Sequence, residues 1–224
     1  MQNFNSMNYT DSYRHKGLRK KLVELVKSKG INDDRILQAI LKIPRHYFLD
    51  AAFADWAYRD VAFPIDADQT ISQPYTVAFQ TELLDVKPKD KILEIGTGSG
   101  YQATVLIELG AKVYTIERQK KLFEKTSKFL AEIGYNSIRT FFGDGYLGLP
   151  RYAPFDKIII TAGANNIPKE LLKQLKIGGI MVIPYGNGDV KDMIKLIKID
   201  AKNIRREKHG KFRFVPFKTG VENK

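Results

Sequence analysis

The sequence contains no cysteine among its 224 residues, and histidine occurs only three times. Without thiols the chain can form neither disulfides nor thiolate metal sites, and a cysteine nucleophile is excluded as well. The histidines, at positions 15, 46 and 209, are scattered and lack the spacing of metal ligands. The acidic residues do not cluster in a metal-binding motif either, so we expect no metal site.

Long apolar runs are also missing. No stretch approaches the roughly 20 apolar residues that a membrane span requires. The first residues have neither the basic nor the apolar region of a signal peptide. Hydrophobic residues still make up 43% of the chain, which favours a globular protein over a disordered one. We therefore expect one domain, located in the cytoplasm and without a membrane partner.

Positive charge is abundant but unevenly distributed. The formal net charge is +12, of which residues 1–30 contribute +5 and residues 201–224 contribute +6, so the 170 residues between them are nearly neutral. A basic domain can indicate nucleic-acid binding, but here the excess belongs to the two ends. It can equally be solvated charge or steer an acidic polypeptide substrate, and nucleic acid is the partner we favour least.

Strand-like and helix-like patterns alternate through the middle of the chain. We expect strands at 91–95, 112–116, 137–142, 156–161 and 180–184, with helices at 74–84, after 100, from 120 and at 168–175. This alternation predicts an α/β, Rossmann-like fold, with a mostly parallel twisted sheet and helices on both faces. Segments 193–199 and 212–217 lack a helix pattern, and we expect them to close the sheet as an antiparallel pair.

The N-terminal part is expected to form a helical cap. Apolar residues recur at helical spacing from Leu18 until Gly30, and a second helix follows Asn32 as its cap and ends before Pro44. The predicted organisation is thus a single domain with a cap over residues 1–68, a cofactor-binding core over 69–200, and a C-terminal strand and basic tail over 201–224.

A glycine-rich turn follows the first strand of the core. Its glycines are Gly96, Gly98 and Gly100, and Glu94 precedes them. Glycine lets the backbone approach a ligand closely, and free N–H groups at a helix start suit polar ligand groups. The dinucleotide fingerprint requires a third glycine at position 101, where a tyrosine stands. The spacing therefore favours another nucleoside-containing cofactor, although an ordinary strand–helix turn remains the alternative.

Two acidic residues end later strands. Glu117 comes 21 positions after Gly96, where a carboxylate can accept both ribose hydroxyls; its alternative is a surface acid. Asp144 could accept from an adenine amino group, although Asp-Gly is also a common turn. Because ligands bind beyond the carboxyl ends of parallel strands, these residues and the glycines should share one site.

One segment indicates which reaction the chain catalyses. It is Gln69-Thr70-Ile71-Ser72-Gln73-Pro74-Tyr75. On physical grounds alone, Ser72 could simply cap the helix that follows. Together with residues 94–102, 143–145, 155–162, 178–184 and 214–216, however, this segment resembles the protein-L-isoaspartate O-methyltransferase family of class I S-adenosylmethionine-dependent methyltransferases. Arg45 and His46 fit as well. The resemblance covers about residues 44–217, and the serine segment is far more specific than the glycine turn.

This resemblance implies methyl transfer from S-adenosylmethionine to L-isoaspartyl carboxylates of proteins, which starts repair through a succinimide. It makes Ser72 the active-site serine and places Val215 in the substrate groove. The implied cofactor-binding residues are Gln69, Thr70, Ile71, Glu94, Gly96, Thr97, Gly98, Gly100, Glu117, Arg118, Asp144 and Gly145. Asp66, Asp68 and Lys218 depart from the family pattern, which puts loop flexibility and peptide preference in question. We expect a monomer.

The sequence leaves four alternative functions. A class I methyltransferase acting on nucleic acid usually has an Asn/Asp-Pro-Pro-aromatic run after its fourth strand, but this chain has Thr161-Ala162-Gly163-Ala164 there. A class I methyltransferase acting on a small molecule is a second alternative. A non-catalytic module that binds S-adenosylmethionine would not need the complete serine segment. A nicotinamide dehydrogenase is disfavoured by Tyr101 and by the lack of a proton-relay set.

Overall fold

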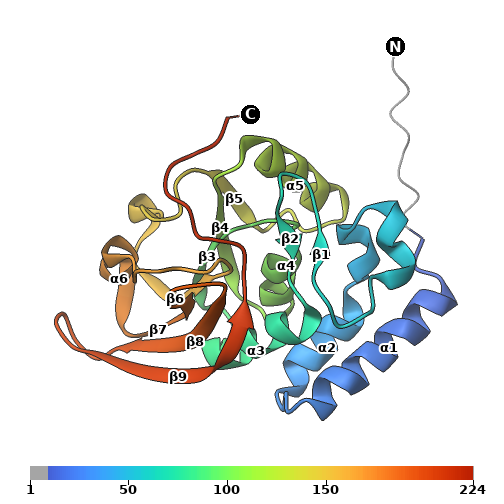
Figure 1. Ribbon diagram of the computed structural model, residues 1–224, viewed down its shortest axis with the longest axis horizontal. Helices are drawn as coiled ribbons and strands as arrows, with labels where there is room; N and C mark the ends of the chain where they lie inside the picture. The colour runs from blue at the N-terminus through green and yellow to red at the C-terminus, as the bar shows by residue number, and fades with distance from the viewer. Residues whose placement is uncertain (1–9, 224) are drawn as a thin grey trace.

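The computed structural model describes residues 10–223, which form a seven-stranded sheet flanked by helices (Figure 1). The strand order is β5-β4-β3-β6-β7-β8-β9. The parallel strands are β3 (Lys91–Ile95), β4 (Lys112–Glu117), β5 (Arg139–Phe142), β6 (Phe155–Ile160) and β7 (Leu175–Tyr185). β8 (Val190–Lys198) runs antiparallel to β7 and to β9 (Ile204–Arg213). The predicted fold class is confirmed.

Helices cover both faces of this sheet because its central strands are apolar on both sides. Neighbouring residues of β3 alternate between the faces: Ile92 packs into the same core as helices α3 (Pro74–Leu84) and α4 (Tyr101–Glu108). Leu93 packs into the opposite core, with α6 (Lys169–Gln174). Helix α5 (Lys120–Glu132) contributes Leu130 to the first core.

The N-terminal helices α1 (Tyr13–Ser28) and α2 (Asp34–Lys42) lie together at one side of the sheet, beside α3 (Figure 1). Along the chain, α2 and α3 are separated by two short helices and a two-stranded antiparallel pair. The helices are η1 (Arg45–Phe48) and η2 (Ala51–Trp56), and the strands are β1 (Phe63–Pro64) and β2 (Thr70–Ile71). The N-cap of α2 is Asp33 rather than the expected Asn32. None of the described helices combines the length and apolar character of a membrane span.

The last strand differs from the sequence prediction. The expected strand at 212–217 is instead β9 at Ile204–Arg213, whose largely exposed and charged residues show no alternating apolar pattern. The chain then leaves the sheet and returns over the carboxyl ends of the parallel strands. There the Gly163 N–H donates to the Val215 carbonyl (2.8 Å), and the Phe217 N–H donates to the Gly163 carbonyl (2.8 Å). This path brings the tail to the predicted site.

Candidate active site

A cavity open to solvent lies at the carboxyl ends of β3, β4 and β6. The structure places most of the predicted site residues in its lining: Gln69, Thr70, Ile71, Ser72, Gly96, Thr97, Gly98, Glu117, Arg118, Gly145 and Val215. Glu94, Gly100 and Asp144 lie outside this lining.

The glycine turn has a shape that other residues would not adopt easily. Gly96, Gly98 and Gly100 all have positive φ, at 94°, 52° and 84°. A Cβ at Gly96 would lie 2.6 Å from the hydroxyl oxygen of Thr161, which donates to the carbonyl of Gly96 at 2.8 Å. A Cβ at Gly100 would instead collide with Leu130 at 2.9 Å. Gly100 therefore serves helix packing, and the first two glycines face the cavity.

Glu117 ends β4 with a carboxylate that is almost completely buried. One oxygen accepts from the Gly98 N–H and the other from the Gln119 N–H, both at 3.0 Å. A carboxylate has about four lone-pair positions, so two remain for a ligand. With an exposed fraction of 4%, Glu117 is not the surface acid of the alternative interpretation.

Asp144 has the geometry of a turn residue. Its carboxylate accepts from the Tyr146 N–H at 2.8 Å and from the Gly220 N–H of the tail at 2.7 Å. Phe217 of the same tail stacks on Tyr146, with ring centroids 4.0 Å apart. Asp144 itself does not line the cavity, although Gly145, the next residue in the chain, does. The adenine contact expected of Asp144 therefore stays a prediction.

Glu94 lies in β3, two residues before the turn, and is fully buried. Neither carboxylate oxygen has a hydrogen-bond partner among the residues described. Burial raises the pKa of Glu94 to about 8; the neighbouring Thr115 hydroxyl opposes the rise, and the negative charge of Glu117 adds to it. The group is therefore largely protonated at neutral pH in this state.

Ser72 does not cap the following helix. The N-cap position of α3 is Gln73, and the N–H of Tyr75 in its first turn is bound by the carboxylate of Asp60 at 2.8 Å. Ser72 instead borders two adjoining cavities, the one above and a second one lined by aromatic and basic side chains. The second lining includes Lys29, Tyr75, Lys211, Phe212, Arg213 and Phe214. Val215 and Thr161 also border both cavities.

Buried Arg45 supports the backbone at Ser72. Its Nη2 donates to the Ser72 carbonyl at 2.9 Å and its Nε donates to the Ala57 carbonyl at 3.0 Å. The guanidinium lies 4.7 Å from the ring centroid of Tyr101, which gives it a cation–π contact. Arg45 thus connects η1, the serine segment and the start of α4.

Sequence reasoning missed several residues of the first cavity. Tyr101, Gln102, Thr161, Ala162, Phe217 and Lys218 were not assigned to the site but line it. Thr161 and Ala162 end β6, so the strand-end rule could have found them. Phe217 had no local signal, and Lys218 stood out only as a departure from the family pattern, because it is the return of the tail that brings both residues there.

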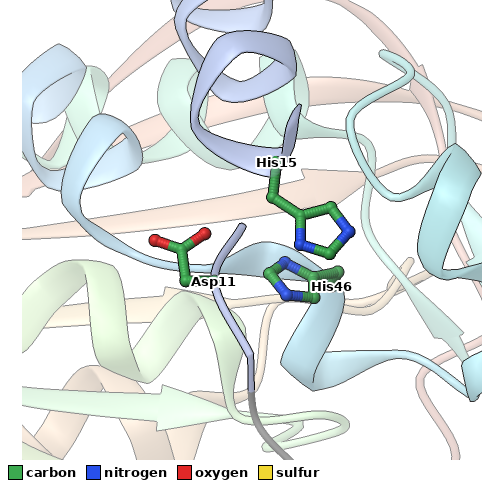
Figure 2. A group of neighbouring side chains, drawn as sticks. All are labelled: Asp11, His15 and His46. Carbon is green, nitrogen blue, oxygen red and sulfur yellow. The ribbon is translucent and has the colours of Figure 1, made fainter. Parts of the chain in front are cut away.

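The histidines are scattered in the sequence, but the fold brings two of them together. His15 and His46 lie together with Asp11, and one potential ligand atom of each lies within 4.8 Å of the others (Figure 2). None of these three residues lines either cavity.

Comparison with known proteins gives consistent matches. A family model described as "Protein-L-isoaspartate(D-aspartate) O-methyltransferase (PCMT)" matches residues 17–222. A protein-L-isoaspartate O-methyltransferase from Christiangramia forsetii is 59% identical over 206 residues, which cover 92% of this chain and 96% of that protein. A solved protein-L-isoaspartate O-methyltransferase aligns with a TM-score of 0.81 and 26% identity, covering 91% of this chain and 67% of that one.

A second solved structure agrees in fold. It is described as a putative protein-L-isoaspartate O-methyltransferase from Plasmodium falciparum in complex with S-adenosyl-L-homocysteine, and its TM-score is 0.78 at 23% identity. The alignment covers 89% of this chain and 98% of that one.

Proposed function

The chain belongs to the protein-L-isoaspartate(D-aspartate) O-methyltransferase family, and we propose that its methyl transfer from S-adenosylmethionine to L-isoaspartyl carboxylates takes place where the two cavities meet. Its substrates are proteins with this damaged form of aspartate, and methylation starts their repair. The observation that carries the placement is the position of Ser72, which borders both cavities.

The first cavity fits the cofactor. Gly96 and Gly98 line the cavity, and Glu117 offers two free lone-pair positions for ribose hydroxyls. When bound, the cofactor supplies an electrophilic methyl group on a sulfonium. The residues that would hold it are Gln69, Thr70, Ile71, Gly96, Thr97, Gly98, Glu117, Arg118 and Gly145.

The second cavity suits an extended peptide that carries a carboxylate. Lys29, Lys211 and Arg213 give its lining positive charge, while Val215 and the aromatic residues offer apolar surface. A carboxylate of pKa about 4 is already ionised at neutral pH, so the reaction needs no general base. Ser72 then donates a hydrogen bond that orients the carboxylate and is not itself a nucleophile.

Alignment is the main contribution of the protein to this reaction. Holding oxygen, methyl carbon and sulfur in line can contribute on the order of 7–11 kcal/mol. The opposite charges of carboxylate and sulfonium disappear as the methyl group moves, so a cavity that excludes water favours the transition state over the separated ions.

One assay tests this function. The purified chain is incubated with methyl-labelled S-adenosylmethionine and two peptides that differ only in Asp versus isoAsp at one position. We expect label in the isoaspartyl peptide alone. Base should release this label, because base hydrolyses a methyl ester. Equal labelling of both peptides, or of neither, would contradict the proposal.

We also propose that the chain acts as a monomer in the cytoplasm and on polypeptides rather than nucleic acid. Strand β9 lies at the edge of the sheet, and its charged residues disfavour pairing with the edge of a second copy. The absence of cysteine suits a reducing compartment. Light scattering after size exclusion should give one chain of 25.6 kDa.

A further inference from the structure

Three side chains that the methyl-transfer site does not use converge in the N-terminal part of the fold (Figure 2). Asp11 precedes α1, His15 lies in the first turn of α1, and His46 lies in η1. The two imidazole rings are 3.8 Å apart between centroids. Nδ1 of His15 and Nε2 of His46 each lie 3.2 Å from the carbonyl oxygen of Thr10. Both ring nitrogens are therefore directed at this carbonyl oxygen, and one ligand atom of each of the three side chains lies within 4.8 Å of the others.

Surrounding groups orient these side chains. Nδ1 of His46 lies 2.7 Å from the Tyr58 hydroxyl, which also accepts from Arg19 at 3.1 Å. When Nδ1–H of His46 donates to this hydroxyl, Nε2 carries the free lone pair, as a metal ligand requires. Such an outer hydrogen bond is the usual support of a metal-binding histidine. Both oxygens of Asp11 accept from Arg19, at 2.9 and 3.1 Å, and each keeps a further lone-pair position.

We propose that Asp11, His15 and His46 form a binding site for a divalent transition-metal ion, with Zn²⁺ as the best match. Two imidazole nitrogens and one carboxylate oxygen are a common zinc ligand set, whereas Ca²⁺ and Mg²⁺ prefer oxygen ligands alone. The Thr10 carbonyl oxygen completes four ligands. Arg19 neutralises the only anionic ligand, so we expect weaker binding than at a site with an unpaired carboxylate.

The ion would connect parts of the chain that are distant in sequence. His46 and Asp11 lie 35 positions apart, and His46 directly follows Arg45, which holds the Ser72 carbonyl. A metal bound here ties the segment before α1 to η1 and so stabilises the backbone behind the active-site serine. Its role is structural, and it takes no part in methyl transfer.

Titration of the metal-free chain with ZnCl₂ in a calorimeter tests the proposal. The chain must carry no histidine tag, and a chelator removes bound metal beforehand. We expect one ion per chain and a higher Tm with zinc. His15→Ala should weaken binding by at least about 100-fold, since loss of an outer-shell partner alone costs about 10–100-fold. His209→Ala is the matched control, because it removes the histidine in β9 and should bind zinc like the wild type.

A second variant separates metal binding from folding. Tyr58→Phe keeps the ring but removes the hydroxyl beside His46, and we expect about 10–100-fold weaker zinc binding. Unchanged cofactor affinity in both variants would show that they are folded. The proposal is overturned if the wild type takes up no zinc at one equivalent, or if His15→Ala binds zinc as tightly as the wild type. The Thr10 carbonyl would then only accept hydrogen bonds from the two imidazoles.

Discussion

Ser72 can be tested without disturbing the fold, because Asp60 and not Ser72 binds the free N–H in the first turn of α3. Ser72→Ala removes a hydroxyl that we expect to donate to the substrate carboxylate. A hydrogen bond to a charged group contributes about 1.5–3 kcal/mol, which corresponds to a kcat/KM about 10- to 160-fold lower. Calorimetry should show unchanged cofactor affinity. Unchanged turnover on an isoaspartyl peptide would refute this role.

Glu94 makes the stability of the cofactor-free protein depend on pH. Its pKa of about 8 in the fold lies above the ordinary value of 4.5. Between these values the folded chain holds a proton that the unfolded chain releases, so stability falls as pH rises, by about 1.4 kcal/mol per unit. Glu94→Gln removes this loss. We expect variant and wild type to be similar near pH 4.5 and the variant to be more stable by several kcal/mol at pH 8.

Urea unfolding at a series of pH values measures this difference. The gap between the two proteins should widen up to about pH 8 and then stay constant, because the folded wild type also loses its proton there. A constant gap across the series would show that the buried carboxyl of Glu94 has an ordinary pKa.

At the scale of elements, β9 and the tail that follows it divide their aromatic residues between the two cavities. Phe217 lines the first cavity and stacks on Tyr146, whereas Phe212 lines the second and lies 5.0 Å from Phe79 between ring centroids. An aromatic pair contributes about 0.5–1.5 kcal/mol beyond its buried area. We expect Phe217→Ala to raise the KM for the cofactor about 2- to 10-fold and to leave the peptide KM nearly unchanged.

Phe212→Ala serves as the matched variant and should show the opposite pattern, with a higher KM for the peptide and an unchanged KM for the cofactor. Steady-state kinetics with each substrate varied in turn measures both constants. If both variants change the same constant, the assignment of one cavity to each substrate is wrong.

The elements that the sequence predicted well are those whose pattern is local. The strands at Lys91–Ile95 and Lys112–Glu117 are apolar runs followed by a glycine turn or an acid, and their ends located the site. The sequence did not predict contacts between residues that are far apart along the chain. The carboxylate of Asp60 reaches Tyr75 from 15 positions away, and no spacing in the sequence indicates it. His15 and His46 are 31 positions apart and meet only because α1 packs against η1.

At the scale of the whole molecule, the sequence alone did not show what function the net charge of +12 serves. Part of the basic C-terminal excess lies in the second cavity, where Lys211 and Arg213 join Lys29 beside Ser72. Lys29 is paired with Asp60, so the two residues of β9 supply most of the uncompensated charge. This arrangement favours steering of an acidic polypeptide over charge that serves solubility alone.

Electrostatic steering of the substrate should weaken as salt is added, because salt screens charges beyond about 8–10 Å at physiological ionic strength. For an isoaspartyl peptide with acidic flanking residues, we expect the KM to rise at least about threefold between low and physiological salt. A peptide of the same length with lysine at the flanking positions should show a constant or falling KM. Lys211→Gln combined with Arg213→Gln should remove most of the difference between the two peptides. Equal salt dependence for both peptides in the wild type would show that the basic residues only solubilise the chain.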